Sequence, residues 1–148
     1  MKSMETFKLT MAQQVANAAI AFQQQRTGVT PGAVTVVLSD QTLVITMRGA
    51  LSAAEKALAK TPAGAAQVQE FHRQLFAASA EPLCQEIKRI TGVEVREAAA
   101  EVEPSIGGVV QVFTTGTMVE VFLLAQGIPA AAWDGDEVVQ ESLKCAGK

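Results

Sequence analysis

The chain of 148 residues contains no tyrosine, one tryptophan, one histidine and two cysteines, and aromatic residues make up only 5% of it. The core therefore has to be built from Val, Leu, Ile and Ala. A catalytic histidine needs an orienting partner and a nucleophile, and a typical zinc site needs several nitrogen or sulfur ligands. His72, as the single histidine, is better explained by a structural or surface role. We expect no metal site and no cofactor.

The chain also lacks basic runs and long apolar runs. Its net charge is -3 and its pI is near 5.2, which disfavours a nucleic-acid partner. No apolar stretch approaches the roughly 20 residues of a membrane-spanning helix. The first ten residues, MKSMETFKLT, lack the apolar region of a secretory signal. Cys84 and Cys145 fit a reducing compartment, which disfavours the alternative of a disulfide between them. We therefore expect a cytoplasmic protein that does not insert into membranes.

What the chain does contain is the composition of a globular domain. Hydrophobic residues make up 49% and charged residues 18%. A chain of this length buries roughly 70% of its unfolded surface and needs no disulfide or metal for stability. It fits one domain, or one domain with an extension.

A first helix is predicted from Met11 to Arg26. Thr10 and Gln13 form a capping box at its start, and Gly28 supplies a left-handed stop. The apolar positions share one face at helical spacing; they are Met11, Val15, Ala18, Ala19 and Phe22.

Two strands follow, from Ala33 to Leu38 and from Thr42 to Arg48. Apolar residues alternate in both, and Ser39, Asp40 and Gln41 form a polar hairpin tip between them. This pattern predicts an antiparallel sheet with one buried and one partly wet face.

Two helices are predicted next. Ser52 and Glu55 form a second capping box that opens a helix from Ala53 to Lys60. Thr61 and Pro62 open a third helix, whose apolar steps of three and four continue past Pro82 to a stop at Gly92. Proline costs about 3 kcal/mol in a helix interior, so one long helix kinked near Pro82 competes with two helices.

The remaining residues predict two further strands, Val93 to Val102 and Val109 to Thr115. Residues 118–126, MVEVFLLAQ, suit either a helix or another strand, and residues 137–145 suit a short helix. The expected fold is α+β: an antiparallel sheet of two β-hairpins with helices packed on one face. The order is α-β-β-α-α-β-β, in a domain of residues 9–115, followed by a C-terminal extension of residues 116–148.

No catalytic constellation emerges from these residues. Cys84 has only Lys88 one turn away as an activating cation, and the glutamates between residues 94 and 103 are typical of a solvated strand edge. The polar residues of most interest are Asp40, Glu55 and Arg73. Glu55 is explained by capping, and Arg73 can pair with an acid or hold an anion.

From the hairpin onward the chain resembles a bacterial family of small proteins. The family is named after the MpsC component of a sodium-translocating, membrane-potential-generating system. The resemblance runs from about Leu9 to Thr115, and no catalytic residues are carried over. The matching residues are Thr27, Gly28 and Pro31, Asp40 at the tip, Gly49-x-Leu51-Ser52-x-x-Glu55-x-x-Leu58-Ala59, Gly64, Val68, Arg73, Ile90-Thr91-Gly92, Glu103-Pro104 and Val109 to Phe113.

The resemblance implies partnership with a membrane system that handles sodium or bicarbonate. We therefore expect a non-enzymatic accessory or regulatory protein that contacts a protein partner, such as a membrane transport component. The alternative is a self-assembling scaffold or a small-ligand binding module, with the ligand between sheet and helices. A small enzyme using Cys84 or the acids from Glu94 to Glu103 is a third hypothesis. The stretch MVEVFLLAQGIPAAAW is too apolar to be wholly exposed, so it covers the sheet or a second copy, and we expect a homodimer.

Overall fold

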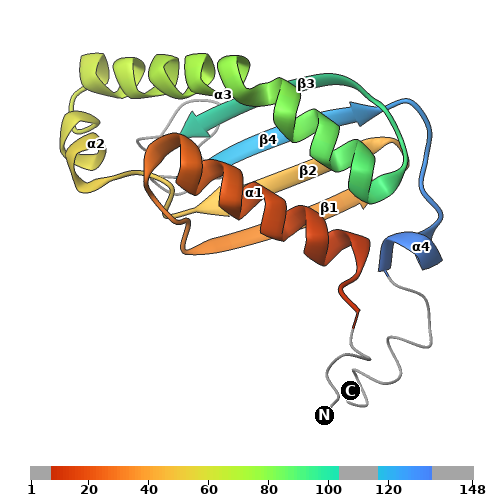
Figure 1. The fold of residues 1–148 in the computed structure, drawn as a ribbon. Helices are drawn as coiled ribbons and strands as arrows, with labels where there is room; N and C mark the ends of the chain where they lie inside the picture. Colours follow the sequence, from red (N-terminus) through yellow and green to blue (C-terminus); the bar gives the residue numbers. More distant parts are fainter. Residues whose placement is uncertain (1–7, 104–116, 135–148) are drawn as a thin grey trace, which may run out of the picture.

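The computed structural model describes residues 8–103 and 117–134. The predicted α+β class and its order of elements are confirmed (Figure 1). The elements are α1 (Met11–Thr27), β1 (Ala33–Ser39), β2 (Thr42–Arg48), α2 (Ala53–Leu58), α3 (Pro62–Thr91), β3 (Val95–Glu103), β4 (Thr117–Leu124) and α4 (Ala130–Asp134).

The four strands form one antiparallel sheet in the order β1-β2-β4-β3. β4 lies between β2 and β3, although it is the last of these strands in the chain. Of the two interpretations of residues 118–126, the strand is therefore correct. β4 and α4 fall inside the predicted extension, so this part of it is built into the fold. The domain boundary itself stays a prediction. The strand predicted at Val109 to Thr115 and the helix predicted at residues 137–145 lie outside the described residues.

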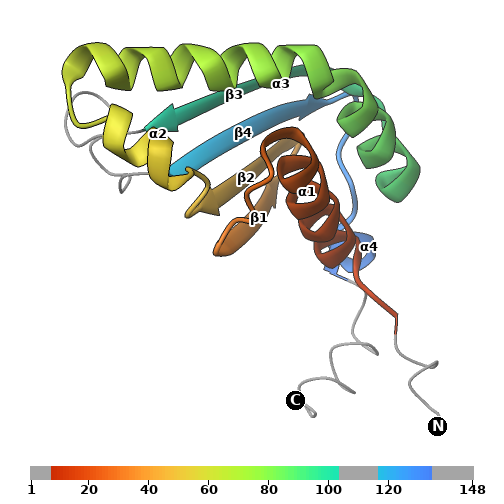
Figure 2. The ribbon, with the colours of Figure 1, turned by 60° about the vertical axis from the view of Figure 1, so that its left-hand side comes forward.

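Both long helices pack on the same face of the sheet. α1 contacts β1, α3 contacts β3, and the two helices contact each other (Figures 1 and 2). The covered face supplies most of the core because alternate strand residues point toward the helices. Its fully buried side chains include Leu43, Ile45, Met47, Met118 and Phe122. α2 lies at one end of the sheet and contacts α3.

The helix boundaries follow the predicted caps. Thr10 accepts from the backbone N–H of Gln13, and the Gln13 side chain accepts from the backbone N–H of Thr10. Gly28 ends α1 with φ 78° and Gly92 ends α3 with φ 79°, a left-handed conformation in which glycine has no side-chain strain. α2 is shorter than predicted and ends at Leu58 instead of Lys60.

α3 is a single helix of 30 residues that continues through Pro82. Of the two alternatives left open by the sequence, one long helix is therefore correct. Figure 2 shows that the helix changes direction toward its C-terminal part. A proline ring displaces the preceding turn of a helix, which is the usual cause of such a bend. The bend lets one helix follow the twisted sheet along its whole length.

The opposite face of the sheet has no described helix over it (Figures 1 and 2). It carries small apolar side chains along a row of register partners from β1 to β3: Val37, Val44, Val121 and Ala99. Val37 is 52% exposed. We call this surface the open face.

Candidate functional site

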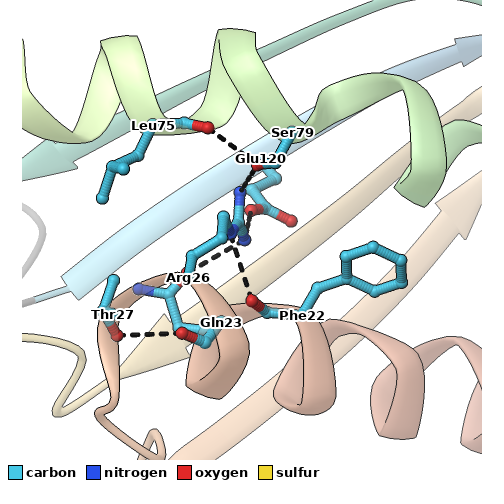
Figure 3. A network of polar contacts seen from close by, with 7 residues as sticks. All are labelled: Phe22, Gln23, Arg26, Thr27, Leu75, Ser79 and Glu120. Atoms are coloured by element: carbon cyan, nitrogen blue, oxygen red, sulfur yellow. Dashed lines mark hydrogen bonds and ion pairs between the residues drawn. The ribbon is translucent and has the colours of Figure 1, made fainter.

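A buried charged cluster joins α1, α3 and β4 on the covered face. Arg26, in the last turn of α1, donates from Nη2 to Oε2 of Glu120 at 2.9 Å and to Oε1 of Gln23 at 2.9 Å. Its Nη1 donates to the hydroxyl of Ser79 on α3 at 3.4 Å. Figure 3 shows these side chains converging between the helices and the sheet. The guanidinium also lies 5.7 Å from the ring centroid of Phe76, within cation–π range.

The cluster is almost free of solvent. The side chains of Arg26 and Glu120 are 6% and 0% exposed. Glu120 lies opposite Ile45 of β2 and Ala100 of β3, which places it in the middle of the sheet. Among the described residues, Oε1 of Glu120 and Nε2 of Gln23 have no hydrogen-bond partner. Burial raises the pKa of the Glu120 carboxyl, and the charge and hydrogen bond of Arg26 offset this only in part.

This geometry indicates a structural role for the pair. Removing one member of a buried ion pair leaves an uncompensated charge and typically costs 3–5 kcal/mol. Because each partner comes from a different element, the pair links the end of α1 to the central strand. A nucleophile with a base oriented toward it is not among these contacts.

A second polar pair lies where α2 meets α3. Glu55 closes the predicted capping box with Ser52: its backbone N–H donates to the Ser52 hydroxyl at 3.1 Å, and its Oε1 accepts from the Ser52 N–H at 2.8 Å. Its other oxygen, Oε2, lies 2.6 Å from Nε2 of His72 on α3. The His72 side chain is 2% exposed and that of Glu55 is 16% exposed.

The surroundings of Glu55 favour its charged form. Burial alone would raise the pKa of this carboxyl. Hydrogen bonds with Ser52 and His72, together with the charge of His72, more than compensate and lower the pKa below its ordinary value of 4.5. Glu55 therefore performs two tasks, capping α2 and attaching α2 to α3. The expected structural role of His72 gains a specific partner.

The other two predicted residues lie elsewhere and are not brought together with Glu55. Asp40 is in the β1–β2 turn, at the opposite end of the sheet from α2 (Figure 1). Its φ of 55° is left-handed, a conformation that aspartate tolerates in tight turns. It borders a shallow cleft of about 380 Å³ beside α4 and Trp133. Arg73 is exposed on α3, and its Nη1 donates to Glu70 at 2.9 Å.

Cys84 lacks the environment of a reactive thiol. It is half-buried on α3, and its pKa is raised by burial first and then by the negative charges of Glu81 and Glu120. A higher pKa lowers the fraction of nucleophilic thiolate. Lys88, the one candidate activating cation, lies 2.6 Å from Glu94 and forms an ion pair with it.

Within residues 8–103 and 117–134, no group of three or more His, Cys, Asp or Glu side chains is arranged to hold a metal ion. The same residues include no helix that is long and apolar enough to span a membrane.

Arg26 and Glu120 were not singled out from the sequence, although a signal exists. Arg26 follows Val15, Ala19 and Phe22 at helical spacing, so it continues the apolar face of α1. Glu120 has the same parity as Met118 and Phe122 in β4. A charge on each of two otherwise apolar faces is costly unless the two charges meet, and this could have indicated the pair.

Comparison with known proteins places these features in a family. The family model described as "Na+-translocating membrane potential-generating system (MpsC)" matches residues 8–126, which include every strand of the sheet. No curated protein and no solved structure matches the chain. The matched region contains both buried polar pairs and the capping box of α2, and it covers well over half of the chain. The chain therefore belongs to the MpsC family.

Proposed function

We propose that this protein is a non-enzymatic accessory or regulatory protein that binds a protein component of a membrane ion-transport system. The observation that carries the proposal is the family match over residues 8–126, whose description names a sodium-translocating, membrane-potential-generating system. The polar clusters described above link secondary-structure elements together, which supports a role in binding over a role in catalysis.

The test is chemical crosslinking in intact cells, followed by affinity capture of the tagged chain from solubilised membranes and quantitative mass spectrometry. A tagged soluble protein of similar size and charge serves as the control bait. We expect a transport component to be enriched over the control. If no membrane transport protein is recovered, the proposed function is wrong.

The open face supports the homodimer that we also propose. The four strands are seven to nine residues long. At about 4.8 Å between strands and about 3.4 Å per residue, they give a face of roughly 500 Å². Two such faces would bury about 1,000 Å², which is the size of a weak, concentration-dependent interface. The row of Val37, Val44, Val121 and Ala99 would form the apolar centre of this interface.

Sedimentation velocity over a wide concentration range tests this dimer. Val37→Asp places a charge on the open face and should keep the chain monomeric. Leu9→Asp is the matched control, because Leu9 is similarly exposed, at 47%, but precedes α1. A wild-type chain that stays monomeric at the highest concentration would contradict the dimer.

A small-ligand binding module is the second candidate function. It is favoured by a groove of about 590 Å³ between α3 and β3, a volume typical of ligand sites. Thermal-shift measurements with a panel of metabolites distinguish it from the first, since only a ligand-binding module should be stabilised.

A further inference from the structure

We propose that the groove between α3 and the outer edge of β3 binds an extended peptide segment, which pairs with β3 as an additional strand. The segment would carry apolar residues at alternate positions and lysine or arginine toward one end. This inference rests on the proposed function in one respect: it assigns the surface through which a protein partner would be held.

Two adjoining hollows form this groove. The larger, of about 590 Å³, lies between Phe76 and Ala77 of α3 and the alanines at residues 98–100 of β3. The smaller, of about 330 Å³, continues past Cys84 toward the start of β3. Ala80 and Ala98 line both hollows, so the two are continuous. The small side chains leave room for apolar side chains of a bound segment.

The backbone of β3 specifies the shape of the occupant. β3 is an edge strand that pairs with β4 on one side, and no described strand pairs with its other side. Such an edge presents N–H and C=O groups that another extended chain can satisfy. A groove between an edge strand and a helix is a recurring mode of peptide recognition, in which main-chain bonds give affinity and side-chain pockets give specificity.

The charge of the lining specifies the sign of the occupant. The two hollows are lined by four acids and three bases. Two of these acids are neutralised, Glu70 by Arg73 and Glu94 by Lys88. The remaining acids, Glu81 and Glu97, both lie at the smaller hollow, where Arg96 is the only other base.

Fluorescence anisotropy with synthetic peptides tests the site. The first probe is a labelled ten-residue peptide with alternating valine and lysine. The second has glutamate in place of lysine. Two further peptides repeat the first with alternate backbone nitrogens methylated, one at the odd residues and one at the even residues. We expect saturable binding of the first peptide that weakens with added salt. We expect at least a tenfold loss with the acidic peptide and with one of the two methylation phases.

Matched variants locate the binding on the protein. Ala77→Phe fills the larger hollow, whereas Ala78→Phe changes the next residue of α3, which is also exposed but does not line it. Glu97→Lys reverses a charge of the smaller hollow, and Glu86→Lys is its control on α3. Binding should fall at least tenfold in Ala77→Phe and Glu97→Lys and stay unchanged in the two controls.

Several outcomes would overturn the proposal: no peptide binding, equal binding by the acidic or by both methylated peptides, or unchanged binding by Ala77→Phe. Self-association that Ala77→Phe abolishes would show a second copy in the groove and would also overturn it.

The proposed function fails separately. If membrane capture fails while the peptide binds, the function is wrong and the groove stands; if Ala77→Phe captures the membrane partner as well as wild type, the groove assignment is wrong.

Discussion

Two buried polar pairs hold helices in place in this molecule, and they differ in origin. Glu55 and His72 are 17 residues apart and join two consecutive helices. Arg26 and Glu120 are 94 residues apart and join the first helix to the last strand of the sheet. The first pair keeps contact with solvent through Glu55, whereas the second is enclosed by the core.

The difference in burial reverses the direction in which the carboxyl pKa is shifted at the two sites. At Glu55, hydrogen bonds outweigh burial and the carboxyl is held in its charged form. At Glu120, burial outweighs the attraction of Arg26 and the pKa of the carboxyl rises. A buried ion pair of good geometry commonly contributes little net stability, so we infer that the value of the Arg26–Glu120 pair lies in matching α1 to β4.

The largest effect should come from leaving Glu120 without its cation. Arg26→Met should lower the free energy of unfolding by about 3–5 kcal/mol, because a carboxylate would then be buried without a counter-charge. Urea denaturation measures the change. In the double variant Arg26→Met, Glu120→Met the loss should largely disappear, since apolar pairs commonly replace buried ion pairs at no cost.

Arg73→Met is the matched control for this experiment. Arg73 also forms an arginine–glutamate pair, but on the surface, where its side chain is 44% exposed. Such pairs contribute about 1 kcal/mol or less. Equal losses in Arg26→Met and Arg73→Met would contradict the importance assigned to the buried pair.

A smaller effect is expected at the α2–α3 pair. His72→Gln should cost about 1–2 kcal/mol, since Glu55 loses one hydrogen bond but keeps those with Ser52. Ser52→Ala should cost about 1 kcal/mol through the lost cap. Because both residues contact Glu55, a double-mutant cycle should show coupling between them; strict additivity would argue against a shared role.

The subtlest difference is the dependence of stability on pH. The folded-state pKa of Glu55 is lowered, so its contribution is present above pH 4.5 and is lost as the pH falls through the folded-state pKa. The folded-state pKa of Glu120 is raised, so its contribution is present below pH 4.5 and is lost as the pH rises through the folded-state pKa.

Urea midpoints of the wild type, Glu55→Gln and Glu120→Gln over a pH series measure this. With rising pH, the wild type should gain stability relative to Glu55→Gln and lose stability relative to Glu120→Gln. Difference curves of the same sign would show that the two carboxyls have similar surroundings.

The parts of the fold that were predictable from sequence are those with a local cause. Both capping boxes, the glycine stops and the alternation in β1 and β2 act over a few residues, and the structure confirms them. Local sequence allowed either one kinked helix or two helices around Pro82, and tertiary packing decides between them. Glu55 was recognised because its partner Ser52 is three residues away, whereas its bond to His72 depends on how α2 packs against α3.

The central strand shows where local reasoning stops. Residues 118–122 read MVEVF, which suits a strand or a helix when it is considered alone. The structure shows a strand, in which Glu120 meets the buried Arg26 from the other end of the chain. A charge on an apolar face can be interpreted only together with its distant partner. The open face and the α3–β3 groove likewise follow from topology.

The order β1-β2-β4-β3 has a consequence for synthesis on the ribosome. β1 and β2 can associate with α1 early, and α3 can fold back along β3, but β2 and β3 cannot belong to one sheet until residues 117–124 have emerged between them. Arg26 is synthesised long before Glu120, so its guanidinium has no carboxylate partner from β4 until that strand is complete. Truncation before β4 should therefore leave β2 and β3 without a common sheet, and completion of the sheet depends on a single late segment.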